Sequence, residues 1–202
     1  MIDLEKIKLI YNIGRGLRME DVQILFKAAS SRTYQPGDYL IREGSEVPEV
    51  FYVRKGLVRV FIINEKGEEI TTQLLPEHHV VASHDVILFD QPSRFFFEAF
   101  EETKTFSMDY DMLQTVISRN KKLDENRKFI LQKLLKISLS RVESFVLYSP
   151  EERYERFVEA NPDLINRVPG KYIANVLGIT PVSLSRIRSR IAVRMKNEEI
   201  KE

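Results

Sequence analysis

Residues 170–190 read GKYIANVLGITPVSLSRIRSR, and this stretch decides how the C-terminal part of the chain folds. At helical spacing its apolar residues form two short faces, separated by a glycine. Gly178 can adopt a positive φ without steric cost and ends the first helix, whereas Thr180 can cap the second helix and Pro181 fits its first turn. The spacing predicts a helix-turn-helix. The two apolar faces are Ile173, Ala174 and Leu177, and Leu184, Ile187 and Ile191.

The second helix of this motif is expected to present a polar and cationic face. With its apolar residues inward, a rotation of about 100° per residue places short polar side chains and arginines on the opposite side. Residues 165–197 contain seven Lys or Arg residues and no Asp or Glu. Such a stretch suits a polyphosphate, so double-stranded DNA is the predicted partner, and a helical hairpin with a solvated basic face is the structural alternative. The predicted DNA-contact residues are Lys171, Thr180, Val182, Ser183, Ser185, Arg186, Arg188, Ser189 and Arg190.

Composition limits the class of protein. The chain has 202 residues with a net charge of +1, and it has no cysteine, which excludes disulfides and cysteine-ligated zinc or iron–sulfur sites. No apolar run approaches the length of a membrane span, and the first residues, MIDLEKIKLI, are too charged for a signal peptide. A soluble cytoplasmic protein without a membrane partner is expected.

The region from Ser31 to about Phe106 changes to a period of two. Runs rich in β-branched and aromatic residues alternate with turn signals such as Pro36-Gly37, Lys55-Gly56 and 64–67. Short strands with a turn about every ten residues predict an antiparallel jelly roll. In the last predicted strand, 94–100, Phe95 and Phe97 share one face, and core packing is the plainer interpretation of its phenylalanines.

Helical patterns surround this β region. Residues 3–29 and 109–116 read as helical, and 120–148 contain no Gly or Pro, which predicts one long helix ending at Ser149-Pro150. The long helix carries two apolar stripes, so it needs two burial partners: the β domain or a second copy of the chain for one, and the C-terminal domain for the other. The stripes are Leu123, Ile130, Leu134 and Ile137, and Leu131, Leu135, Val142, Phe145 and Val146.

The order of these parts resembles the Crp/Fnr family of bacterial transcription regulators over nearly the whole chain. The motifs that carry the resemblance are Pro36-Gly37-Asp38, Glu43-Gly44, residues 52–58 (YVRKGLV), residues 150–154 (PEERY) and residues 173–180 (IANVLGIT). The resemblance implies an α+β chain with three parts: an N-terminal cyclic-nucleotide-binding-like jelly roll (1–119), a long dimerisation helix (120–149) and a C-terminal winged helix-turn-helix (150–202).

The resemblance also implies partners. The family forms homodimers zipped along the long helix, which would make Leu123, Ile130, Leu134 and Ile137 the dimer seam. Two reading helices one DNA turn apart would then bind a pseudo-palindromic site. RNA polymerase and a small-molecule effector would be further partners. Neither catalytic activity nor a cofactor is expected.

The predicted effector site departs from the cyclic-nucleotide pattern. Family members that bind these ligands carry a Gly-Glu pair for the ribose and a later Arg-Ser or Arg-Thr pair for the phosphate. Here the two places read Val81-Ala82-Ser83 and Arg94-Phe95, so cyclic AMP is not the expected effector. The pocket would hold something more apolar or stay empty, with regulation by abundance alone. The effector-pocket candidates are Ser83, Arg94, Phe95 and Phe97.

The reading helix departs from the pattern of the cyclic AMP receptor as well. The Arg-Glu pair at its start is replaced by Pro181-Val182, although Arg186 can still meet guanine and Val182 a thymine methyl group. Lys171, Arg188, Arg190 and Arg194 suit phosphate contacts. The operator should therefore differ from that of the receptor.

Two other functions compete with this interpretation. The three histidines, His78, His79 and His84, lack the spacing of a jelly-roll metal site, so neither metal-dependent catalysis nor haem binding is expected. The serious alternative is a ligand-sensing or scaffolding module whose C-terminal part does not bind DNA specifically.

Overall fold

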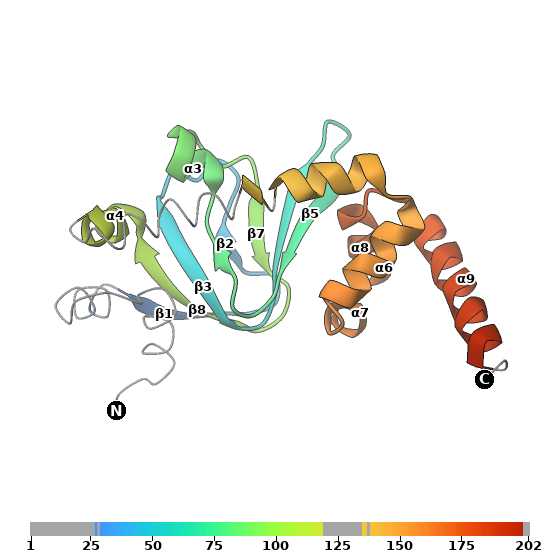
Figure 1. The fold of residues 1–202 in the computed structure, drawn as a ribbon. Helices are drawn as coiled ribbons and strands as arrows, with labels where there is room; N and C mark the ends of the chain where they lie inside the picture. Colours follow the sequence, from blue (N-terminus) through green and yellow to red (C-terminus); the bar gives the residue numbers. More distant parts are fainter. Residues whose placement is uncertain (1–26, 28, 119–134, 137, 200–202) are drawn as a thin grey trace, which may run out of the picture.

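The computed structural model describes residues 27, 29–118, 135–136 and 138–199 (Figure 1). Most of the helix expected over 3–29 and the first half of the helix expected over 120–148 lie outside the described residues. The same is true of the predicted seam residues Leu123, Ile130, Leu134 and Ile137.

The N-terminal part is a sandwich of two antiparallel sheets, each of four strands. The strand order is β1-β8-β3-β6 in the first sheet and β2-β7-β4-β5 in the second. This arrangement confirms the predicted jelly roll. The strands are β1 (Ser30–Tyr34), β2 (Tyr39–Ile41), β3 (Glu49–Lys55), β4 (Val58–Ile63), β5 (Glu69–Leu75), β6 (Val80–Val81), β7 (Phe96–Ala99) and β8 (Thr103–Asp109).

Apolar side chains from both sheets fill the space between them. Val58 and Val60 of β4 pack with Phe51 and Val53 of β3, and Phe97 of β7 joins the same cluster. This alternation is the one read from the sequence, because every second residue of a strand points inward.

The sequence pattern predicted neither the two-residue strand β6 nor the longer strand β8. The inward side chains of β8, Thr103, Thr105 and Ser107, are small hydroxyl residues that are buried at 0–2% exposure. The strand therefore lacks the apolar alternation that marks its neighbours, although it pairs with both β1 and β3.

Helices follow the sandwich. Two short ones are α3 (His84–Phe89) and α4 (Tyr110–Ser118), and residues 135–136 and 138–147 are helical and are called the linker helix here. The C-terminal head consists of α6 (Pro150–Ala160), α7 (Leu164–Arg167), α8 (Gly170–Val176) and α9 (Pro181–Glu199). Within the described residues 150–199, α7 fills the segment between α6 and α8, and no strand pair forms a wing there.

The head packs against the sandwich rather than hanging free. Leu57 and Leu74 of the sandwich belong to the same buried cluster as Leu164, Ile173 and Leu184 of the head. In Figure 1, α8 lies beside the end of β5, which is an edge strand of its sheet. This contact fixes where the helix-turn-helix stands relative to the β domain.

The second apolar stripe of the linker helix divides between two environments. The Phe145 ring lies against the turn at Gly178, where an added Cβ would come within 2.6 Å of it. In contrast, Leu135, Val142 and Val146 are 60%, 62% and 77% exposed. Only part of the predicted stripe is therefore covered by this chain.

Candidate nucleic-acid interface and sensor site

The helix-turn-helix is built as its apolar spacing predicts. Ile173 and Ala174 are fully buried, and Leu184 and Ile187 are each 2% exposed, so the two helices press their apolar faces together. Gly178 has a φ of +65°, which a residue with a side chain rarely adopts. The Ile179 N–H donates to the Ala174 carbonyl at 3.0 Å, which closes the turn.

Thr180 caps α9. The Ser183 N–H donates to the Thr180 hydroxyl oxygen at 3.1 Å, and the two hydroxyl groups are 2.9 Å apart. Pro181 occupies the first position of the helix, where its missing N–H costs nothing. The cap fixes where the helix starts, and therefore which side chains its first turns present.

The predicted DNA face of α9 is the solvent side of the head. Val182 is 61% exposed, and Ser185, Arg186, Ser189 and Arg190 are also exposed. Thr180 is exposed next to them, whereas Ser183 is half-buried. The structure thus brings most of the predicted contact residues to one accessible surface.

The cations on α9 differ in how free they are. Among the described residues Arg186 makes no ion pair, while Arg190 pairs with Glu151 at 2.9 Å. Arg194 pairs with Glu151 and Glu155. Both acids come from α6, so acidic groups lie beside this segment in the folded chain although its own sequence has none. Arg186 therefore carries the most available charge of the three.

Arg188 and Lys171 have contacts of their own. The Arg188 Nε donates to the Tyr154 hydroxyl at 3.2 Å, so this guanidinium lies between α9 and α6, partly inside the head. Lys171 is exposed, and its Nζ is 4.6 Å from the centre of the Tyr172 ring. Their roles toward phosphate stay predictions, and that of Arg188 would require its side chain to turn outward.

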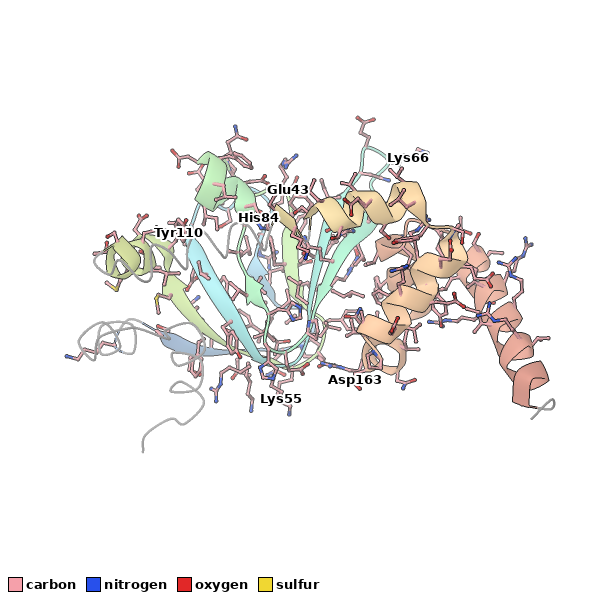
Figure 2. The ribbon with its side chains drawn as sticks, viewed as in Figure 1. Glu43, Lys55, Lys66, His84, Tyr110 and Asp163 are labelled. Carbon is pink, nitrogen blue, oxygen red and sulfur yellow. The ribbon has the colours of Figure 1, made fainter. Side chains whose placement is uncertain are left out.

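Ion pairs join the head to the sandwich. The Arg167 guanidinium contacts Glu77 and Glu101, which lie in loops at the same end of the sandwich. Figure 2 shows Lys55, at the end of β3, and Asp163, just before α7, at the same edge of the molecule. Hydrogen bonds from Arg167 raise its pKa, chiefly those to Glu77. Partial burial would raise the pKa of Glu77, but bonds from Arg167 and from backbone amides outweigh it, and the pKa is lowered.

α8 covers the outer face of the second sheet. Arg59 is 3% exposed and stacks between the Phe61 and Tyr172 rings, with its guanidinium 4.2 and 4.4 Å from their centres. The Asn175 side-chain oxygen accepts from the Thr71 N–H at 3.3 Å. This bond occupies a backbone donor of an edge strand that would otherwise face solvent.

The sensor candidates lie around α3 and β7. Phe97 and Phe95 pack in the sandwich core, and Ser83 is 2% exposed with a hydroxyl that has no partner among the described residues. Arg94 is exposed, and the carboxylate that it holds belongs to Asp85. Their roles toward an effector stay predictions.

Asp85 is the residue of this region that sequence reasoning missed. It is 3% exposed, and it accepts hydrogen bonds from the Arg94 backbone N–H, Nε and Nη2 at 2.9, 3.1 and 2.9 Å. The Arg94 guanidinium is the main cause of the lowered pKa of Asp85. An outside anion would have to take Arg94 from this buried carboxylate.

Residues 31–120 match the model of the cyclic nucleotide-binding domain. Electron transport regulator A of Shewanella oneidensis is 25% identical over 174 residues, which are 77% of this chain and 66% of the relative. The anaerobic regulatory protein of Bacillus subtilis is 22% identical over 129 residues, 62% of this chain and 53% of the relative. A CooA mutant from Carboxydothermus hydrogenoformans has the same fold, with a TM-score of 0.66, 23% identity and coverage of 84% and 79% of the two chains. Residues 31–120 therefore form a cyclic nucleotide-binding-type domain, and the chain is similar to regulators of the Crp/Fnr type.

The described part of the chain has a cyclic-nucleotide-binding-type domain followed by a helix-turn-helix, and the Crp/Fnr proteins that it resembles are regulatory. The chain spans less than two thirds of the length of the two curated relatives it matches. Over the residues that the structure describes, no helix has both the length and the apolar character needed to cross a bilayer.

Proposed function

We propose that the chain is a sequence-specific transcription regulator that binds double-stranded DNA with the first turns of α9. The observation that carries this proposal is the exposed face of α9, where Val182, Ser185 and Ser189 surround an Arg186 guanidinium with no ion-pair partner among the described residues. A major groove about 12 Å wide admits a helix with such a face.

The predicted contacts divide into two kinds. Arg186 can donate two bonds to guanine, and Val182 can pack against a thymine methyl group. Lys171 and Arg190 suit phosphates, which position a protein without reading sequence. Arg190 must exchange its ion pair with Glu151 for a phosphate, so its net contribution should be smaller than that of Arg186.

A homodimer is part of the same proposal. The linker helix exposes Leu135, Leu139, Val142 and Val146, which follow 4-3-4 spacing along one face. On an ideal helix with 100° per residue, the predicted seam residues Leu123, Ile130, Leu134 and Ile137 would lie roughly 140° from this face. Within the described residues, we therefore propose that the exposed stripe of the linker helix contacts the second copy of the chain. The seam predicted from the sequence stays a prediction.

The remaining assignments follow from the family. The regulator acts in the cytoplasm, without catalytic activity, and its three parts are residues 1–119, 120–149 and 150–202. Any effector differs from cyclic AMP, because Arg94 is already bound to Asp85. A contact with RNA polymerase is expected of an activator. The alternative function is a ligand-sensing or scaffolding module whose head does not read DNA.

Salt dependence of binding to random duplex DNA tests the proposal. A dimer with several phosphate contacts should lose affinity for DNA steeply as the salt concentration rises. Protein binding releases counterions from the DNA, and this release is less favourable when the solution already contains much salt. The Arg186→Gln and Arg190→Gln variants should bind more weakly, with Arg42→Gln as an exposed control on the sandwich. Unchanged affinity and slope in the first two variants would mean that this face does not bind DNA.

A further inference from the structure

A cavity lies where the linker helix, α6 and α8 meet, and the functions proposed above do not use it. Its volume is about 240 Å³, and it opens to solvent. It is lined by Arg141, Ser144 and Phe145 of the linker helix, by Arg153, Arg156 and Phe157 of α6, and by Val176 at the end of α8 and Leu177, which follows it. This volume is slightly below the range of about 300–1,000 Å³ for drug-sized ligands, so it suits a small molecule.

The cavity wall is cationic and carries no acid. Three of its residues are arginines, and none is Asp or Glu. Neither do the described residues form an ion pair with these arginines. Glu152, one helical turn before Arg156, interacts with it electrostatically, and the Glu152 carboxylate is engaged in the cap of α6 by a 2.8 Å bond from the Ser149 N–H.

Neutral groups hold the three guanidiniums in place. Arg141 donates to the Thr72 carbonyl of β5 at 2.5 Å, and Arg153 donates to the Leu177 and Tyr148 carbonyls at 3.2 and 2.8 Å. The Arg156 guanidinium lies 3.8 Å from the centre of the Tyr148 ring. Surrounding protein lowers the pKa of Arg141. Among the described residues, the guanidiniums are thus positioned by neutral groups without an ion pair, and the hydrogen bonds they make are those of Arg141 and Arg153 named above.

Two aromatic rings complete the wall. Phe145 and Phe157 offer apolar surface beside the guanidiniums. An inorganic anion would use only the cations, whereas a ligand with an aromatic ring and an acid group would use both. Guanidiniums bind carboxylates and phosphates by paired, charge-assisted bonds.

We propose that this cavity binds a small aromatic or apolar organic anion, whose acid group meets Arg141 and Arg156 and whose ring packs on Phe145 and Phe157. The apolar stripe that we place in the dimer contact lies on the opposite side of the linker helix, so binding does not compete with pairing. Two of the cavity's lining residues contact other parts of the chain, Arg141 the Thr72 carbonyl of β5 and Phe145 the turn at Gly178, so an occupant would brace the head. An effector role therefore rests on the proposed function, whereas binding itself does not.

Isothermal titration with phenyl phosphate and with benzoate tests the site in the full chain without DNA. Both should bind saturably at one site per chain, inorganic phosphate more weakly, and uncharged benzyl alcohol not at all. The Arg156→Gln variant should lose about tenfold or more in affinity, which is the size of a lost charged hydrogen bond. Arg42→Gln is the matched control, because it too removes an exposed arginine lying over a tyrosine ring, at 4.1 Å from Tyr39.

Absence of saturable binding by both acids, or equal affinity in Arg156→Gln and the control, overturns the proposal. A second result would also overturn it: neither acid binds, while Arg156→Gln lowers DNA affinity and reduces the salt dependence of DNA binding by about one unit of slope. The arginines would then contact DNA phosphates instead of a small ligand. If the acids bind but leave DNA affinity unchanged, the effector role is wrong and the site stands. Because the titration contains no DNA, it tests the ligand site independently of the proposed DNA binding, and either can fail without the other.

Discussion

The Arg167 guanidinium holds the Glu77 carboxylate by two hydrogen bonds of 3.0 Å each, between residues 90 positions apart in the chain. The same carboxylate accepts a 2.8 Å bond from the Gly56 N–H in the turn between β3 and β4. One acidic group therefore connects a turn of the sandwich to α7 of the head. The placement of the helix-turn-helix depends on this contact and on the cover that α8 gives to β5.

A double-mutant cycle should show that Arg167 and Glu77 are energetically coupled. The pair is two-pronged and its side chains are only 25% and 30% exposed, so we expect a coupling of about 1–2 kcal/mol. Urea unfolding of Arg167→Gln, Glu77→Gln and the double variant measures it. The Arg190–Glu151 pair, at 65% and 28% exposure, is the control and should give about 0.5 kcal/mol or less. Equal couplings for the two pairs would contradict the importance of the Arg167 contact.

Removing the Asp85 charge should change the response of stability to acid. The pKa of Asp85 is lowered in the folded chain, so its contribution is fully present above the unfolded value of about 3.9 and is lost as pH falls through the folded value. Asp85→Asn should cost about 1–3 kcal/mol at pH 6, because a buried carboxylate no longer holds Arg94. Below about pH 4 the variant should lose stability less steeply than the parent chain. Parallel curves from pH 6 to 2 would contradict this account.

Two glycine substitutions separate backbone strain from steric clash. Gly56 and Gly67 both have positive φ, +98° and +78°. A Cβ at Gly67 would meet nothing within 4 Å, whereas at Gly56 it would lie 2.5 Å from the Glu102 carbonyl oxygen. Gly67→Ala should cost about 1–2 kcal/mol from strain alone. Gly56→Ala should cost about 1–3 kcal/mol more, because backbone must move. Equal losses in thermal unfolding would show that the turn can relax.

A charge on the exposed stripe of the linker helix should separate the homodimer. Val142→Lys places an ammonium group where we expect two copies to meet, and burial of an unpaired charge there is unfavourable. Sedimentation velocity should show a monomer. Val47→Lys is the control, because Val47 and Val142 are both 62% exposed and Val47 lies on the sandwich. A dimer that survives Val142→Lys would move the contact to another surface, such as the seam predicted over residues 123–137.

The sequence predicted the features of the helix-turn-helix that depend on neighbouring residues: its turn, its helix cap and its buried faces. The turn at Gly178, the cap at Thr180 and the buried Leu184 and Ile187 follow from spacing alone, and all were found. Strand β8 escaped prediction because its inward residues are hydroxyl-bearing, so its sequence lacks the contrast that marks a strand.

Contacts between distant segments escaped prediction for a different reason. The acids that pair with Arg190 and Arg194 come from α6, and the cavity arginines come from two elements. Asp85 reads as an ordinary surface acid until folding places it against Arg94. A sequence pattern shows which residues share a face of a helix or strand, but not which residues pack on that face. The net charge of the DNA-facing surface of α9 could therefore be judged only from the structure.

Selection of bound sequences from a random duplex pool, with purified protein and no added ligand, tests the central claim most directly. The account predicts enrichment of a two-fold symmetric motif with half-sites about one helical turn apart, since two copies would present two α9 helices. Replacing Arg186 with Gln should relax the preference at one position of each half-site. Failure to enrich any motif, both without ligand and with phenyl phosphate or benzoate added, would contradict sequence-specific binding by α9.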